Sequence, residues 1–192
     1  MQTRTGRGAA TEQAILQATR ELLAEGGVQH LTIEGVAARS GVAKTTIYRR
    51  YRDKDDLALS VVLDMVEQVM LPVLGDTRAE LVQFVSAAVH QLGSTLMGRV
   101  MQGLVSDLAV DPELAAAFQE RVVSVRDAEV ARLVARGIER GDIAADVDEQ
   151  LAHELLIAPL YYRLLLSGHP LDHAFAERIV DAALRALGPN AT

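Results

Sequence analysis

The chain has 192 residues, of which 49% are hydrophobic but only 4% aromatic, and it contains neither Cys nor Trp. The lack of Cys excludes disulfides and cysteine-ligated metal sites, and it leaves mainly Leu, Val and Ala to fill a core. No apolar run reaches the roughly 18 residues of a transmembrane helix, and the polar, basic start of the chain is unlike a secretory signal peptide. We therefore expect no contact with a membrane and a cytoplasmic location.

The formal net charge of −7 is unevenly distributed along the chain. Residues 1–52 contain eight basic and four acidic residues, whereas residues 53–192 contain 11 basic and 22 acidic residues. A basic head on an acidic body orients a molecule on a polyanion with the head first. The two regions are therefore expected to have different functions.

Apolar residues recur at helical spacing along most of the chain, and the abundance of Ala and Leu favours helix over sheet. Residues 1–8 are expected to be disordered. We expect an all-α fold of about nine helices, at about 9–24, 33–39, 44–51, 54–72, 77–92, 100–108, 112–140, 149–167 and 173–187. Helix-start signals support these limits at Asp53, Asp111-Pro112, Asp148 and Asp172.

Two of the short helical patterns, in the stretch TIEGVAARSGVAKTTIYRRYRDK, are joined by a tight turn. Thr32 is a natural N-cap for the first pattern, and Gly41 supplies the positive φ that a sharp exit requires. The second pattern buries Ile47 and Tyr51, leaves donor side chains pointing outward, and has no acidic residue before Arg52. These features predict a helix-turn-helix whose second helix fits the major groove of DNA.

Residues 13–59 resemble the DNA-binding domain of the TetR family of transcriptional regulators, through AILQATRELLAEGG, LTIEGVAARSGVAKTTIYRRY and DKDDL. The resemblance implies a three-helix DNA-binding domain at 8–53, a linking helix at about 54–72, and a helical ligand-binding and dimerisation domain at 73–192. Gly35 departs from the family pattern, because an acidic residue is common there and would complete a capping box. The helix at 33–39 is therefore expected to be looser than usual.

By position, the resemblance assigns seven residues to contact with double-stranded DNA: Thr32, Lys44, Thr45, Thr46, Tyr48, Arg49 and Lys54. Lys44, Thr45 and Arg49 are expected to read base edges. The others are expected to contact phosphates, and Thr46 also suits a thymine methyl group. Arg50 either binds a phosphate or is simply solvated, and the same holds for Arg52.

The resemblance further implies a homodimeric repressor that reads a palindromic operator and leaves it when a small-molecule effector enters the body. The expected dimer surface is the last two helices, with a candidate seam of Phe175, Ile179, Ala183 and Leu187 facing Leu155 and Tyr162. The expected effector residues are Phe84, Met97, Met101, Phe118, Arg126, Tyr161 and Tyr162. For both sets the alternative is that they fill an internal core.

Two other functional classes remain open. One is an architectural DNA-binding protein without an effector, whose body would be solidly packed. The other is an enzyme with a DNA-binding appendage, although the sequence has no nucleophile motif, phosphate-binding loop or paired-carboxylate signature. The five histidines show no metal-ligand spacing, so we expect neither a metal nor another cofactor.

Overall fold

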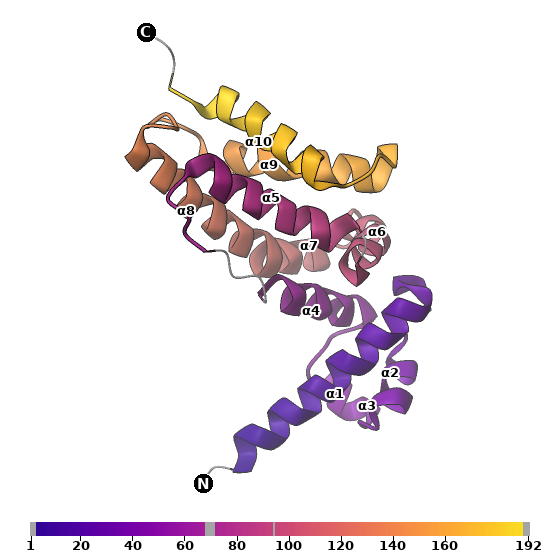
Figure 1. Ribbon diagram of the computed structural model, residues 1–192. Coiled ribbons are helices and arrows are strands. Elements are labelled where there is room, and N and C mark those ends of the chain that lie inside the picture. Colours follow the sequence, from indigo (N-terminus) through magenta and orange to yellow (C-terminus); the bar gives the residue numbers. More distant parts are fainter. Residues whose placement is uncertain (1–2, 68–71, 94, 190–192) are drawn as a thin grey trace. The chain divides into compact units, whose positions relative to one another are not determined.

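Helices account for almost all of the regular structure, as the periodicity predicts. The computed structural model describes residues 3–67, 72–93 and 95–189, and no strand occurs within these segments. The helical elements are α1 (Thr3–Gly26), η1 (Val28–His30), α2 (Ile33–Ser40), α3 (Lys44–Tyr48), α4 (Lys54–Glu67), α5 (Thr77–Gly93), α6 (Leu96–Leu108), α7 (Pro112–Phe118), η2 (Gln119–Val123), α8 (Ser124–Arg140), α9 (Glu149–Tyr162), η3 (Arg163–Ser167) and α10 (His173–Leu187) (Figure 1). In the described residues α7, η2 and α8 follow one another without a break, as do α9 and η3, so the expectation of nine helices is confirmed.

The helices form two compact units. Among the described residues, unit 1 contains α1 to α4, the part of α6 from Arg99 onward, and α7, whereas unit 2 contains α5 and α8 to α10. The grouping of residues 99–118 with the amino-terminal helices was not expected from the sequence. It has a packing reason at Gly103, because a Cβ atom there would lie 2.9 Å from Cγ2 of Val28. The domain limits expected above remain a prediction.

In unit 1, α1 packs against α2 and α4, and the centre is filled by side chains with almost no exposed area. They include Ile15, Leu23, Leu31, Val36 and Ile47. Two limits of α1 and α3 differ from the sequence prediction by more than two residues: α1 begins at position 3 rather than near position 9, and α3 ends at position 48 rather than 51. Extending an existing helix costs less than nucleating one, so the early start needs no apolar pattern of its own.

Unit 2 is a bundle in which α5, α8, α9 and α10 lie side by side (Figure 1). Its core contains Phe84, Leu156 and Leu160, each at most 1% exposed. The predicted α10 dimer seam is wrong, because its residues Ile179, Ala183 and Leu187 are between 2% and 6% exposed within a single chain. Their apolar stripe covers α5, to which α10 makes its main contact.

A buried carboxylate joins the beginning of α5 to the end of α8. Glu80 accepts hydrogen bonds from Arg136 Nε at 2.8 Å and Arg140 Nη2 at 3.0 Å, and from the backbone N–H groups of Leu74 and Gly75. Burial alone would raise the pKa of Glu80, but these four donors outweigh it and lower the pKa to about 2. The network therefore stabilises unit 2 only while Glu80 is ionised.

We predict that Glu80→Gln destabilises the protein by about 3 kcal/mol at neutral pH, since each pKa unit corresponds to about 1.4 kcal/mol. A carboxyl group with a lowered pKa contributes fully above its ordinary pKa of 4.5 and loses that contribution as the pH falls towards 2. The difference between wild type and variant in urea denaturation should therefore shrink between pH 5 and pH 2.

The matched control is Asp181→Asn, which removes an exposed carboxylate that also binds an arginine, with Arg78 Nε at 2.7 Å. Solvent screens this pair, so its loss should be much smaller than that of Glu80→Gln. Equal losses for the two variants, or a pH-independent difference for Glu80→Gln, would contradict the prediction.

Candidate DNA-binding site

The turn between α2 and α3 has the geometry that the sequence predicts. Thr32 is the N-cap of α2, and its Oγ1 accepts a hydrogen bond from the N–H of Gly35 at 3.0 Å. Gly41 has φ of 69° and donates its N–H to the carbonyl of Ala37 at 3.1 Å. The left-handed φ of Gly41 would be strained in any residue with a Cβ, so the sharp exit from α2 depends on this glycine.

Gly35 has a packing function that the sequence did not reveal. A Cβ atom at this position would lie 3.1 Å from Oγ1 of Thr32 and 3.4 Å from a terminal methyl of Leu22 on α1. The small residue therefore leaves room both for the cap of α2 and for the contact with α1.

The short helix α3 is held from one side and exposed on the other. Ile47 has no exposed area and Tyr51, just beyond the helix, is 6% exposed, so both anchor α3 to unit 1. The N–H groups of Arg50 and Tyr51 both bond to the carbonyl of Ile47, and the four-residue spacing puts Tyr51 on the same face as Ile47. The opposite face presents Lys44, Thr45, Tyr48 and Arg49 to solvent, while Thr46 is half-buried.

The basic side chains around α3 differ in what they contact. Within the described residues the side chain of Arg49 has no hydrogen-bond or ion-pair partner. Lys44 Nζ lies 2.7 Å from Oε1 of Glu34 on α2. Arg50 reaches back to α1, where its Nη2 donates to the carbonyl of Gly8 at 3.3 Å. Arg49 is therefore the cation of this group most available to a ligand.

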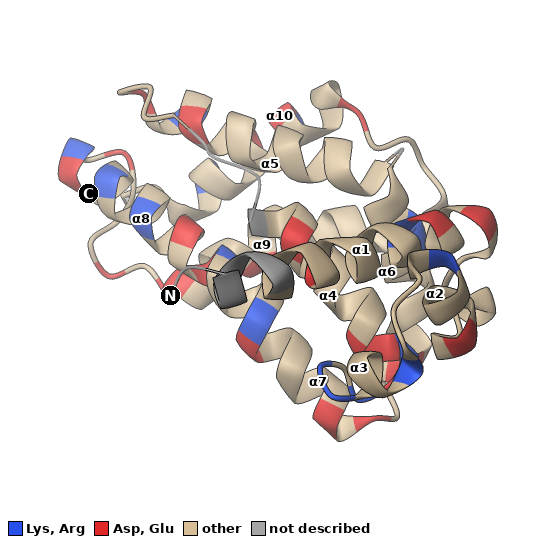
Figure 2. Cartoon of the chain, turned by 90° about the horizontal axis from the view of Figure 1, so that it is seen from below, with Lys and Arg blue, Asp and Glu red and all other residues tan. Residues whose placement is uncertain are grey.

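Arg52 is engaged with acidic side chains, in contrast to the expectation that it is solvated or binds a phosphate. Its guanidinium donates to Asp53 at 2.7 Å, to Asp111 at 2.9 Å and to Glu113 at 2.6 Å. The hydrogen bond to Asp53 raises the pKa of Arg52, and the carboxylates at the start of α7 raise it further. In Figure 2, basic (blue) segments follow α3 and acidic (red) segments lie at the start of α7. Arg52 therefore ties the exit of α3 to α7 within unit 1.

The two remaining predicted DNA contacts lie at helix starts. Thr32 is exposed at the start of α2. Lys54, the first residue of α4, is half-buried, and its Nζ lies 3.4 Å from the carbonyl of Val28 and 3.4 Å from Oδ1 of Asp55. Both distances are long for charged hydrogen bonds, so the Lys54 ammonium is weakly held.

Models of two known domain families match the chain. The model described as bacterial regulatory proteins of the tetR family matches residues 15–61, and the model described as tetracyclin repressor-like, C-terminal domain, matches residues 71–183. The chain belongs to the TetR family. It is a DNA-binding transcriptional regulator of this family, and α2 and α3 are its helix-turn-helix.

Relatives that align with nearly the whole chain support this assignment to the TetR family. The DNA-binding transcriptional repressor TetR of Mycobacteroides abscessus is 30% identical over 94% of this chain and 95% of its own. The transcriptional regulator YdeS of Bacillus subtilis is 26% identical, over 97% and 96%. Among solved structures, the TetR-family transcription regulator SCO0332 is 34% identical and superposes with a TM-score of 0.77, covering 93% of this chain and 99% of its own.

In unit 2 of this TetR-family chain, three of the seven predicted effector residues come together. The guanidinium carbon of Arg126 lies 5.9 Å from the ring centre of Phe84, and its nitrogens donate to Gln91 Oε1 at 2.7 Å and Glu129 Oε2 at 2.8 Å. Burial raises the pKa of Tyr161, and the nearby charge of Arg126 opposes that shift. Phe84 on α5 and Arg126 on α8 thus lie together, and Tyr161 on α9 is near enough to feel the charge of Arg126; we call these three residues the half-polar cluster.

Of the other four predicted effector residues, three remain predictions and one is corrected. Met97 is buried in unit 2, whereas Met101 and Phe118 belong to unit 1. Tyr162 is 60% exposed and lies on the surface of α9, so the prediction that it lines an interior pocket is corrected. The helical spacing of apolar side chains does not show which neighbouring helix each of them contacts.

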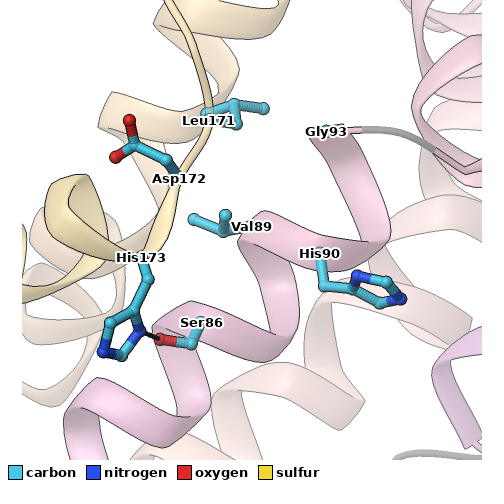
Figure 3. A pocket seen from close by; sticks show the side chains of 7 residues that line it. All are labelled: Ser86, Val89, His90, Gly93, Leu171, Asp172 and His173. Carbon is cyan, nitrogen blue, oxygen red and sulfur yellow. Dashed lines mark hydrogen bonds between the residues drawn. The ribbon is translucent and has the colours of Figure 1, made fainter.

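A separate pocket of about 310 Å³ opens between α5 and the segment that enters α10. Val89 and Leu171 line it, and Ser86 Oγ lies 2.9 Å from Nδ1 of His173 at its edge (Figure 3). The imidazole of His90 points away from that of His173 (Figure 3), and no group of three metal-ligating side chains occurs among the described residues. None of the helices in the described part of the chain has the length and hydropathy of a bilayer span.

Proposed function

We propose that this TetR-family regulator is a homodimeric repressor that binds a palindromic operator through α2 and α3 and is released by a small-molecule effector. The observation that carries the DNA-binding part is the division of α3 into a buried anchor, Ile47, and an exposed donor face. A helix anchored in this way can enter a major groove without losing its packing.

Within this proposal Arg49 is the principal base reader, because its side chain is exposed and has no partner in the described residues. A guanidinium suits the O6 and N7 acceptors of guanine, and one such contact gives about 1–3 kcal/mol of discrimination. Lys54 is a phosphate contact, since its weakly held ammonium sits at the start of α4. Thr32, Thr46 and Tyr48 complete the phosphate contacts, and Thr45 reads bases beside Lys44.

We predict that Lys54→Ala weakens binding to all duplexes by a similar factor and reduces the slope of log affinity against log salt by about one. Arg49→Ala should instead relax the preference at one base pair in each half-site, by about tenfold or more. Fluorescence anisotropy on duplexes selected by the wild type, and on scrambled ones, measures both effects. The same loss on selected and scrambled DNA for both variants would refute this division.

The dimer proposal rests on an exposed apolar stripe on α9 and η3. Leu151, Tyr162 and Leu166 are 47%, 60% and 77% exposed, and Leu155 and Ala158 lie between them at helical spacing. Large apolar side chains in a continuous row on a surface mark interaction sites. A second copy of the same stripe would cover it isologously, and two heads could then read half-sites one helical turn apart.

We predict that Leu166→Glu raises the dimer dissociation constant at least about 100-fold, because a two-fold axis would bury two carboxylates without partners. Analytical ultracentrifugation at micromolar concentration measures the change. Val110→Glu is the matched control, since Val110 is 79% exposed but belongs to unit 1 and is not part of the stripe. A wild-type monomer, or a Leu166→Glu variant as dimeric as the control, would contradict the proposal.

The effector proposal rests on the cluster of Phe84, Arg126 and Tyr161, which combines an aromatic wall with two polar groups inside a helical bundle. A ligand releases DNA only if it binds the non-binding arrangement more tightly than the DNA-binding one. Arg52, which binds three carboxylates, is the proposed connection between the DNA-binding helices and α7. The chain then continues from α7 through η2 into α8, which carries Arg126.

We predict that a screen of small organic molecules by thermal shift yields compounds that raise the melting temperature of the wild type and lower its operator affinity. Arg126→Ala should reduce that stabilisation at least tenfold in apparent affinity, since the ligand binds only the folded state. Hits that stabilise the protein without changing DNA binding, or an absence of hits, would favour an architectural DNA-binding protein instead.

A further inference from the structure

An acidic side chain lies on the surface that faces the duplex when α3 enters the major groove. Glu34, in the first turn of α2, has its Oε1 2.7 Å from Nζ of Lys44, in the first turn of α3. The side chains of Glu34 and Lys44 are 61% and 51% exposed. If Lys44 reaches a base edge, the Glu34 carboxylate lies at the edge of the same groove.

As an acid in the first turn of α2, Glu34 suits the positive end of that helix, but this does not require the contact with Lys44. Exposed ion pairs contribute little to stability, and Glu34 touches no second basic residue among the described hydrogen bonds and ion pairs. On a surface that binds a polyanion, an extra negative charge also weakens every phosphate contact in its neighbourhood. A residue that lowers affinity for all DNA can still increase the difference in affinity between sequences.

We infer that Glu34 determines operator sequence by holding Lys44 towards a base edge, as a positioning residue that does not itself read a base. This inference rests on the proposed function, because it requires Lys44 to face DNA. Without Glu34 the long Lys44 side chain is drawn to the nearest phosphate, a contact that carries no sequence information.

The number of hydrogen bonds fits this role. A lysine ammonium has three N–H donors, and one is used by Oε1 of Glu34. Two donors remain, and guanine offers two acceptors in the major groove, O6 and N7. The hydrogen bond from Lys44 lowers the pKa of Glu34, and the negative carboxylate repels phosphates that compete for the same ammonium. Glu34 and Lys44 together therefore favour a G·C pair at one position of each half-site.

The test is selection from a random duplex pool with the wild type, Glu34→Gln, Lys44→Ala and the double variant. Glu34→Gln should bind scrambled DNA roughly three- to tenfold more tightly, because a repulsive charge is removed. It should also lose about fivefold or more of the preference at one base pair per half-site, and Lys44→Ala should lose the preference at that same pair. The double variant should lose no more at that pair than Lys44→Ala alone, since residues that act as a unit are not additive.

Glu25→Gln is the matched control. The Glu25 side chain is also 61% exposed and also binds one basic residue, with its Oε1 2.6 Å from Nη1 of Arg39, but that pair joins α1 to α2 away from α3. This variant should select the wild-type sequence. If Glu34→Gln keeps the wild-type preference at every position, or shifts it at a pair that Lys44→Ala leaves unchanged, the inference fails while the proposed function stands. If the wild type selects no sequence at all, both fail.

Discussion

A helix of five residues cannot hold its own position, and the structure of unit 1 follows from that constraint. Isolated helices much longer than α3 are marginal in water, so its conformation depends on packing. Ile47 inserts from the middle of α3, Tyr51 inserts from just beyond its end, and Gly41 fixes the angle at which the chain enters. These three residues fix the position of α3, so its exposed donors are held rigidly. Direct reading of DNA bases requires such rigid donors.

Local signals predicted most of the fold. Asp53, Asp148 and Asp172 accept N–H groups at the starts of α4, α9 and α10, as their positions before apolar runs indicate. Such signals act within a few residues, so one sequence contains them completely. The π-helical segments η2 and η3 were not predicted, because a widened turn contains the same residue types as the α-helix around it.

The sequence could not show which helices and which charged side chains contact each other in the folded chain. The apolar stripe of α10 fits a dimer seam and a contact with α5 equally well, and only the structure shows Ile179 and Ala183 buried against the bundle. Charge has the same limitation. Lys44 and Arg52 stand in a stretch without acids between them, yet Glu34 comes to Lys44 from the preceding helix and Glu113 comes to Arg52 from 61 residues away. Counting charges along the chain therefore overstated how many cations are unengaged.

The position of η2 has a mechanical consequence. The chain passes from unit 1 to unit 2 at residues 118–119, where α7 becomes η2, and the backbone there is helical rather than a slack loop. Each residue of an α-helix turns it by about 100°, so rewinding the wide turn of η2 by a single residue rotates every following side chain by more than a quarter of a circle. The winding of Gln119–Val123 therefore sets the direction of the α8 side chains about the helix axis.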